Sequence, residues 1–376
     1  MTTESTETNN NATTTEQIRT PITDLFKINH PIFLAGMNVA AGPKLAAAVT
    51  NAGGLGVLGG INYTPDMLRD QIEELKSHLT DKNAPFGVDL LLPQVGGNAR
   101  KTNYDYTKGK LNELVDIIIE SGAKLFVSAV GVPPKHVVDK LHANGIVYMN
   151  MIGHPKHVKK CLDLGVDIIC AQGGEGGGHT GDIATTILIP AVVEACKGAI
   201  SPLTKKEVLV VAAGGIHSGP LLASALMMGA SAVWAHKEAC PHCRLLPTPI
   251  RTLIFTGRPL RVRKNPYIEN WETERAQEIK ELTSKGKLPY ESDIDKLMSG
   301  AAEIPKAMKD AYKADNGSDE VDVDDLLDHF QPFLMGQCAS VCNEKKNAKA
   351  IVDEFVNDAV AVIRKGNSLI TVSSKL

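Results

Sequence analysis

The sequence lacks the features that mark membrane, secreted and nucleic-acid-binding proteins. No apolar run approaches the roughly 20 residues that cross a bilayer. Residues 1–20 are rich in Thr, Asn and Glu, and they lack the basic start and apolar stretch of a secretory signal. Seven cysteines, an odd number in 376 residues, argue against a disulfide framework and favour a reducing compartment. A net charge of −3 excludes the strongly basic surface that nucleic acids or anionic membranes require.

These absences predict a cytoplasmic protein, with an organelle left open, whose partners are small molecules rather than nucleic acid or membrane. Residues 1–20 are expected to form a disordered N-terminal segment. Hydrophobic residues make up 43% of the chain, which is enough for a sizeable core. A homo-oligomer is compatible with this composition.

Aromatic residues are scarce, at 5%, whereas 33 glycines indicate tight turns and packing through small residues. Between residues 31 and 235, a short apolar run followed by a helical pattern recurs eight times. Such runs are typical of strands buried on both faces, and eight of them predict an α/β fold, the (β/α)8 TIM barrel. An open doubly wound sheet is the alternative. The eight runs are Ile32–Ala35, Leu55–Leu58, Phe86–Leu91, Leu125–Ser128, Ile146–Asn150, Ile168–Ala171, Val208–Ala212 and Ala232–Ala235.

The composition changes after Cys240, which indicates an inserted domain. We predict a barrel over residues 21–250, an inserted, mainly helical substrate-side domain over 251–335, and a C-terminal return to the barrel over 336–376. Helical patterns in the insertion cover Glu272–Ser284, Ser292–Ala302 and Val323–His329. An amphipathic stripe from Val352 to Ile363 predicts the returning helix.

A glycine-rich segment directly after the sixth run is the strongest functional signal. It reads Ala-Gln-Gly-Gly-Glu-Gly-Gly-Gly-His-Thr-Gly over residues 171–181. Barrel active sites lie at the carboxyl ends of the strands, which is where this segment falls. Its glycines allow the backbone to approach a flat or anionic ligand, and His179 is a candidate general base or acid. A flexible surface loop with a solvated histidine is the competing interpretation.

Three other strand ends carry weaker signals. Gly214 and Gly215 follow the seventh run, where barrels bind phosphate through backbone N–H groups. Met37 follows the first run and is either a cofactor contact or plain packing. Asp89 lies in the third run and is either a polar group in the barrel mouth or only a cap.

Two motifs are rejected, and no metal site is predicted. Residues 54–59 match G-x-G-x-x-G, but they span a strand after a helical pattern, which is the wrong context for a dinucleotide site. The Cys-Pro-His-Cys segment at 240–243 has no second Cys or His pair at zinc-finger spacing. The acidic stretch 315–325 has no glycine at the sixth position of an EF-hand loop and no glutamate that closes a twelve-residue loop.

The glycine-rich segment and the Ala-Ala-Gly-Gly-Ile string at 212–216 together resemble the nitronate monooxygenase family, formerly called 2-nitropropane dioxygenases. The resemblance implies an FMN at the mouth of a TIM barrel, covered by a helical second domain. It implies that His179 is the catalytic base, and that Gly336 and Gln337 lie at the return into the barrel. The residues expected at the flavin and its phosphate are Met37, Asn38, Asp89, Gln172, Gly177, Ala213, Gly214, Gly215, His236 and Lys237.

The same resemblance implies the reaction. An alkyl nitronate, or a nitroalkane after His179 removes its α-proton, is oxidised with FMN and O2 to a carbonyl compound and nitrite. One alternative is an NAD(P)H-dependent FMN reductase of quinones or enoyl thioesters, since relatives with that activity share the barrel and the His loop.

A departure from the family motif supplies another alternative. Where the family has Gly-Thr-Arg-Phe after the eighth strand, this chain has Ala235-His236-Lys237-Glu238. A non-catalytic or aberrant variant with a damaged FMN phosphate site would result if Lys237 does not replace the lost phosphate contacts. Met151 stands near the place where some relatives have a lysine.

One dense basic stretch remains, with cations at Arg258, Arg261, Arg263 and Lys264. It is either a solvated face or a device that steers anionic substrate toward the barrel mouth.

Overall fold

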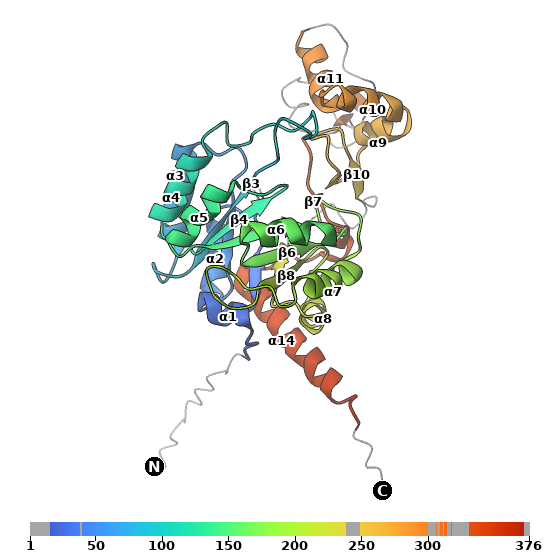
Figure 1. The fold of residues 1–376 in the computed structure, drawn as a ribbon. Coiled ribbons are helices and arrows are strands. Elements are labelled where there is room, and N and C mark those ends of the chain that lie inside the picture. Colours follow the sequence, from blue (N-terminus) through green and yellow to red (C-terminus); the bar gives the residue numbers. More distant parts are fainter. Residues whose placement is uncertain are drawn as a thin grey trace, which may run out of the picture.

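The computed structural model describes residues 16–37, 40–237, 249–299 and 331–371, with a few single positions between 306 and 317 (Figure 1). Within these ranges, eight parallel strands form one sheet in the order β1-β9-β8-β6-β5-β4-β3-β2. The strands are β1 (Ile32–Leu34), β2 (Gly56–Gly59), β3 (Phe86–Leu91), β4 (Leu125–Ala129), β5 (Val147–Ile152), β6 (Ile168–Gln172), β8 (Leu209–Ala213) and β9 (Ala232–Ala235).

A parallel bridge between Phe33 and Leu55 joins the two edges of this sheet. Leu34 N–H donates to the Leu55 carbonyl at 2.9 Å, and Leu55 N–H donates to the Ile32 carbonyl at the same distance. The sheet therefore closes on itself, so the TIM barrel is confirmed and the open doubly wound sheet is wrong.

Helices cover the outside of the barrel between successive strands. They are α2 (Pro43–Asn51), α3 (Pro65–His78), α4 (Leu111–Glu120), α5 (Lys135–Ala143), η1 (Pro155–His157), α6 (Val158–Leu164), α7 (Thr185–Cys196) and α8 (Gly219–Met227). Local chemistry sets their starts. In α3, for example, Thr64 Oγ1 accepts the N–H of Met67 at 3.2 Å, while Pro65 occupies the first helical position. Of the described helices, none is long and apolar enough to cross a membrane.

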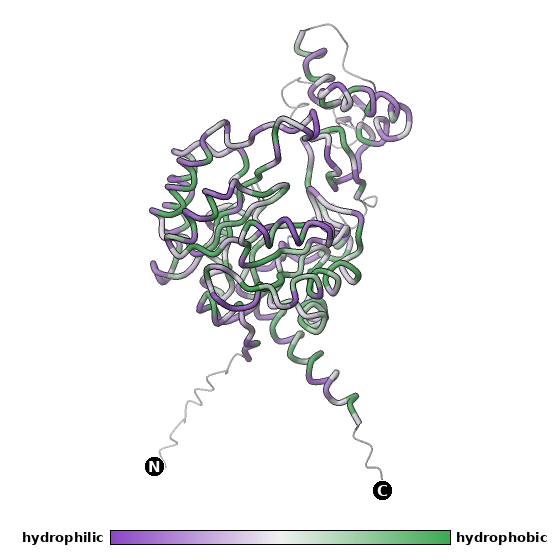
Figure 2. Tube along the Cα trace, in the orientation of Figure 1, coloured by the Kyte–Doolittle hydropathy of each residue, from purple (hydrophilic) through white to green (hydrophobic). Residues whose placement is uncertain are grey.

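Alternating residues of the strands divide the core into two layers. One side of the strands packs against the helices in the larger cluster of buried residues, which includes Val88 and Leu90. The other side fills the barrel with residues such as Val127, Met149 and Trp234. Helix α1 (Pro21–Phe26) adds Ile22 and Phe26 to this inner cluster and so closes the amino-terminal end of the barrel. Hydrophobic segments accordingly gather in the barrel (Figure 2).

The long C-terminal helix α14 (Ala348–Asn367) lies against α8 and α2. It therefore occupies the place of the eighth helix of the barrel, although residues 236–347 separate it from the eighth strand. Phe355 and Val356 on its apolar face are fully buried. Asn347 caps the helix by accepting the N–H of Ala350 at 2.8 Å.

The described part of the insertion lies beyond one end of the barrel, away from α1 and from the last turns of α14 (Figure 1). Its helices α9 (Pro266–Thr273), α10 (Ala276–Ser284) and α11 (Pro289–Met298) pack around Tyr267 and Trp271. The helical pattern predicted over Glu272–Ser284 is divided between α9 and α10, because the chain turns between them, where Arg275 pairs with Asp293 at 2.8 Å. The helix predicted over Val323–His329 and the acidic stretch 315–325 fall on residues that are not described, apart from Gly317.

A second, three-stranded sheet joins the insertion to the barrel, and nothing in the sequence predicted it. Strand β10 (Ile250–Thr252) pairs with β11 (Leu260–Val262), and β11 pairs with β7 (Gly178–His179). Because β7 lies inside the glycine-rich segment, the insertion is hydrogen-bonded directly to the segment that carries His179. The 3-10 helix η3 (Gln337–Val341) follows on the return toward the barrel.

Candidate active site

The expected site residues that are described lie at the carboxyl ends of the barrel strands. Asp89 lies in β3, Gln172 ends β6, Ala213 ends β8, and Met37 and Lys237 follow β1 and β9. Since these ends meet at one mouth in a closed parallel barrel, the fold brings together positions that are far apart in the sequence. Asn38 and the Cys-Pro-His-Cys segment at 240–243 lie outside the described residues.

His179 is held at this mouth by contacts on its backbone and its ring. Its carbonyl accepts the side-chain amide of Gln172 at 2.9 Å, and its backbone pairs with Leu260 of β11. Its Nε2 lies 3.2 Å from Oγ1 of Thr256, a residue of the insertion. Burial and, second, the nearby Arg258 guanidinium lower the pKa of the imidazole to about 4. His179 is therefore a neutral imidazole at neutral pH.

The glycine-rich segment before His179 is fixed rather than flexible, and a buried arginine of the insertion fixes it. Arg261 is 8% exposed, and its Nε and Nη2 donate to the carbonyl of Gly174 at 3.2 and 2.8 Å. The carboxylate of Glu175 accepts the backbone N–H and the hydroxyl of Thr185 at the start of α7. A Cβ on Gly177 would lie 2.7 Å from the backbone nitrogen of Gly336, which places the return segment against this loop.

Gly214 and Gly215 form a backbone cradle after β8. Both have left-handed φ angles, +97° and +71°, which favour glycine. A Cβ on Gly214 would lie 2.7 Å from the backbone nitrogen of Gly173, so only glycine allows the two loops to meet there. The carbonyl oxygen of Gly214 also lies 2.8 Å from Thr185 Oγ1, whose one hydrogen it shares with the Glu175 carboxylate. The loops after β6 and β8 therefore form one rigid surface.

Asp89 is a buried carboxyl group inside the mouth. It is 2% exposed, and among the described residues its Oδ1 has no hydrogen-bond partner. Burial raises the pKa of this carboxyl well above its usual range. A Cβ on Gly36 would lie 2.8 Å from Asp89 Oδ2, so the segment after β1 closes tightly over the group. Met37, next in the chain, is half-buried against both layers of the core.

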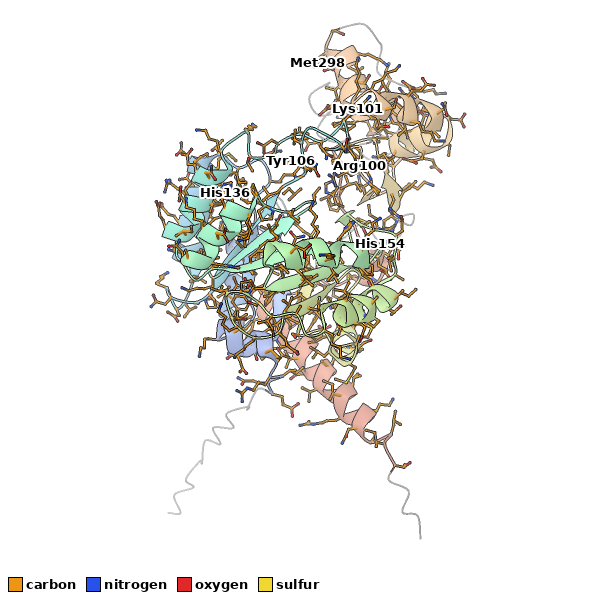
Figure 3. The ribbon with its side chains drawn as sticks, viewed as in Figure 1. Arg100, Lys101, Tyr106, His136, His154 and Met298 are labelled. Carbon is orange, nitrogen blue, oxygen red and sulfur yellow. The ribbon has the colours of Figure 1, made fainter. Side chains whose placement is uncertain are left out.

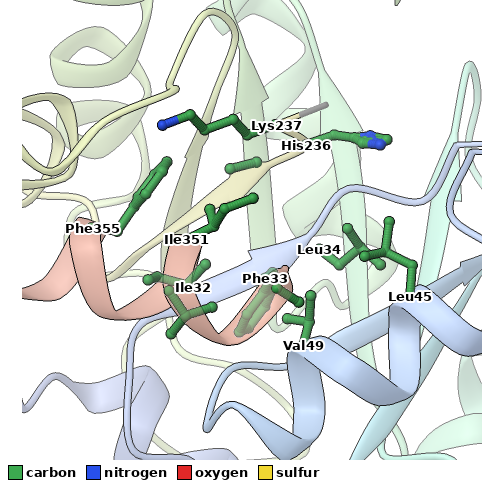
Figure 4. A pocket seen from close by; sticks show the side chains of 12 residues that line it. Ile32, Phe33, Leu34, Leu45, Val49, His236, Lys237, Ile351 and Phe355 are labelled. Atoms are coloured by element: carbon green, nitrogen blue, oxygen red, sulfur yellow. The ribbon is translucent and has the colours of Figure 1, made fainter. Parts of the chain in front are cut away.

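Lys237 lies in an apolar environment against α14 rather than open to the mouth. Its Nζ is 3.1 Å from Glu354 Oε1 and lies over the ring of Phe355. His236 and Lys237 border an apolar pocket between β1, α2 and α14 (Figure 4). The side chains around that pocket include Ile32, Leu34, Leu45, Val49, Ile351 and Phe355.

The site also contains residues that the sequence patterns did not single out, or singled out for another reason. Thr256, Glu175 and Thr185 carried no signal. Arg258 was noticed only as one cation of a basic stretch. The cations of that stretch have different surroundings in the structure. Arg261 is buried against Gly174, and Arg263 lies over the ring of Phe333. Among the described members, Arg258 is the one that influences the pKa of His179.

Comparisons with known proteins agree with this architecture. A family model described as nitronate monooxygenase matches residues 19–322. The (3aS,4S,5R,7aS)-5-hydroxy-7a-methyl-1-oxo-octahydro-1H-indene-4-carboxyl-CoA dehydrogenase of Rhodococcus jostii is 38% identical over 216 residues. That match covers 57% of this chain and 53% of the relative, so it spans about half the relative's length.

Two further comparisons point the same way. A probable nitronate monooxygenase of Staphylococcus saprophyticus is 27% identical, over 67% of this chain and 80% of that protein. In fold, the nitroalkane oxidase of Streptomyces ansochromogenes superimposes with a TM-score of 0.69 over 92% of this chain and 99% of that one, at 22% identity. Because the family model spans most of the sequence and the barrel carries the motifs at its mouth, the chain belongs to the nitronate monooxygenase family, a family of oxidoreductases.

Proposed function

We propose that this chain oxidises alkyl nitronates with FMN and O2 to carbonyl compounds and nitrite, and that it oxidises nitroalkanes after His179 removes their α-proton. The observation that carries the proposal is the neutral imidazole of His179 in the barrel mouth, beside the cation of Arg258. A neutral base next to a fixed positive charge suits a carbon acid, because the proton leaves to the base while negative charge develops near the cation.

The residues at the mouth fit FMN on two observations. The Gly214–Gly215 pair follows β8, where barrels bind phosphate through backbone N–H groups, and both residues have the left-handed φ that glycine favours. The buried Oδ1 of Asp89 has no partner among the described residues and would accept a hydrogen bond from a ligand. When bound, FMN would accept electrons from the substrate and pass them to O2.

The hydrogen bonds of Thr256 support Nδ1 of His179 as the atom that takes the proton. The Thr256 hydroxyl donates to the carbonyl of Arg258 at 3.3 Å. Its oxygen is then an acceptor toward His179, so Nε2 carries the ring hydrogen and Nδ1 keeps the lone pair. On this assignment Nδ1 accepts the α-proton, and Thr256 stabilises the imidazolium by accepting from Nε2.

The test begins with the visible spectrum of the protein after incubation with FMN and gel filtration. Retained flavin, followed by nitrite release from propane-2-nitronate, is the expected result. His179→Asn should abolish turnover of 2-nitropropane but spare its nitronate, because only the neutral compound needs a base. Flavin-loaded protein that releases no nitrite from either compound would overturn the proposal.

A second candidate is a flavin-dependent reductase or dehydrogenase that acts on thioesters. The 38% identity to a carboxyl-CoA dehydrogenase favours it. Anaerobic bleaching of the flavin by NADH, followed by reoxidation with an enoyl thioester, would identify this activity. Folded protein that retains no flavin would instead support the non-catalytic variant, in which the altered segment after β9 has lost the phosphate site.

A further inference from the structure

Arg258 is fixed at the barrel mouth by segments from three parts of the chain. Its Nε donates to Asn103 Oδ1 at 3.0 Å, in the loop after β3. Its Nη1 donates to the carbonyl of Val130 at 3.3 Å, directly after β4. Thr256, two residues before it, contacts His179 in the loop after β6. The guanidinium is thus preorganised at the mouth instead of extending into solvent.

The charge of Arg258 is not compensated within the described part of the chain. No carboxylate lies within ion-pair distance of it there, and the same holds for Arg100, whose Nη1 donates to the carbonyl of Gly257 at 2.9 Å. By contrast, Arg275 pairs with both Glu278 and Asp293. Burial and the nearby Arg100 lower the pKa of Arg258, which records the cost of holding two cations together.

Donor groups of Arg258 remain available in this arrangement. Nε and Nη1 each make one of the hydrogen bonds above, and the described residues offer no acceptor to Nη2. A guanidinium with a free edge binds a planar oxyanion through two parallel hydrogen bonds. Arg100 and Tyr106 lie on the segment that runs from the barrel toward the insertion (Figure 3), and the hydrogen bond from Arg100 to Gly257 brings this segment to the residue next to Arg258.

The backbone that accepts from Arg258 is strained. Val130 has a φ of +68°, a conformation that a β-branched residue adopts only at a cost of about 1–3 kcal/mol. The turn is held locally, since Gly131 N–H donates to the Ala129 carbonyl at 2.8 Å and Ser128 Oγ donates to the Gly131 carbonyl at 3.2 Å. The strained turn directs the Val130 carbonyl at the guanidinium, which is typical of a position set for binding.

We propose that Arg258, with Arg100 beside it, is an oxyanion-binding site that holds the charged oxygens of the substrate next to His179 and selects anionic substrates. For nitronates, this inference rests on the proposed function. The two N–O oxygens of a nitronate would face the free edge of Arg258, with its carbon toward the imidazole. A neutral nitroalkane gains this contact only as its proton leaves, because only then does charge develop on its oxygens.

The kinetic test compares one carbon skeleton in two charge states. In Arg258→Met, KM for propane-2-nitronate should rise roughly 10- to 100-fold, the value of a charge-assisted contact to the bound anion. For 2-nitropropane, KM should stay unchanged while kcat falls by a similar factor, because the contact forms only in the transition state. Arg263→Met, which removes a cation of the same stretch that lies over Phe333, is the matched control and should leave both substrates unaffected.

If Arg258→Met raised KM and lowered kcat by the same factors for both substrates, the result would contradict the site. Arg258→Lys provides a second variant, because it keeps the charge but loses the fork. It should recover part of the nitronate affinity, and no recovery combined with a lowered melting temperature would assign Arg258 a structural role.

A measurement without flavin or turnover separates this inference from the proposed function. The pKa of His179 can be followed by NMR of histidine-labelled protein, with His179→Asn for assignment and sodium nitrate as a planar oxyanion probe. Nitrate should raise this pKa in the wild type by offsetting the field of Arg258. In Arg258→Met the pKa should start higher and ignore nitrate.

The outcomes can be told apart. Absence of nitrite release with an intact nitrate response would overturn the nitronate reaction but keep the oxyanion site. A wild-type His179 that does not respond to nitrate, or responds equally in Arg258→Met, would overturn the site itself.

Discussion

The ring nitrogen Nε2 of His179 lies 3.2 Å from the hydroxyl oxygen of Thr256, although 77 residues separate them in the chain. The first belongs to a loop of the barrel and the second to the insertion. Their backbones are also joined, since His179 of β7 pairs with Leu260 of β11. The insertion therefore helps to set the position of the candidate base.

The pH dependence of nitroalkane oxidation should report the environment of His179. The active form of a base is the unprotonated one, and burial beside Arg258 lowers the pKa of this imidazole to about 4. kcat/KM for 2-nitropropane should therefore stay level as the pH falls from neutrality to about 5, and drop only below that. A histidine with its ordinary pKa of 6.5 would produce the drop near 6.5 instead, and such a profile would contradict the assignment.

The same group links stability to pH. Below pH 6.5 the unfolded chain takes up a proton on His179, whereas the folded protein resists protonation until about pH 4. Stability contributed by the neutral imidazole is therefore present above 6.5 and is lost as the pH falls toward 4. Urea denaturation of the wild type and His179→Asn across this window should show a steeper acid loss in the wild type.

The glycine cradle should not tolerate a side chain. In Gly214→Ala, the new Cβ would lie 2.7 Å from the Gly173 nitrogen, and the loops after β6 and β8 must separate. We expect loss of flavin on gel filtration, measured by the ratio of flavin to protein absorbance. Gly145→Ala is the control, because Gly145 also has a positive φ, +70°, but no atom within 4 Å of its Cβ. Equal flavin retention in the two variants would contradict a cradle at Gly214.

The barrel was predictable because its strands are buried on both faces. A short continuous apolar run such as Ala232–Ala235 is typical of a buried strand, and the observed β9 has those bounds. The position of the glycine-rich segment followed from the strand before it. The place of Gly214 and Gly215 after the seventh run predicted a phosphate site, and the family resemblance implied the same pair.

The contacts between barrel and insertion were not predictable by such patterns. Strand β7 consists of Gly178 and His179, and two residues after a run of glycines carry no strand signal. The positive charge alone also did not distinguish Arg258 from Arg261. In the folded chain, Arg261 is buried against the Gly174 carbonyl, whereas Arg258 lowers the pKa of His179. The hydrogen bonds that decide these cases join residues that are far apart in the chain.

Lys237 should contribute to stability through Glu354. The two side chains are 14% and 30% exposed and lie 3.1 Å apart, and Glu354 also contacts Lys346 at 2.7 Å. We expect Lys237→Met and Glu354→Gln each to lower stability by about 1 kcal/mol, and the double variant to lose less than their sum. Urea melts of the four proteins give this coupling.

Flavin retention tests the other role expected of Lys237, which is to neutralise the charge of the FMN phosphate. If Lys237→Met keeps its flavin while losing stability, the ion pair with Glu354 is its function. If it loses flavin and Glu354→Gln binds FMN more tightly, the lysine exchanges between the carboxylate and the phosphate. A variant with unchanged stability and unchanged flavin would contradict both roles.

Asp89→Asn should stabilise the folded protein without flavin, and more so as the pH rises. Burial raises the pKa of this carboxyl above the unfolded value of 3.8, so above that pH the unfolded chain ionises while the folded state resists. The wild type therefore loses stability as the pH increases from about 4, whereas asparagine, with no proton to lose, does not. Melting temperatures at acidic and neutral pH should differ between the two proteins only at neutral pH. If FMN donates a hydrogen bond to Asp89 Oδ1, the stability gained by Asp89→Asn should shrink when flavin is added. A stability gain that is the same at acidic and neutral pH would contradict the explanation from a buried carboxyl group.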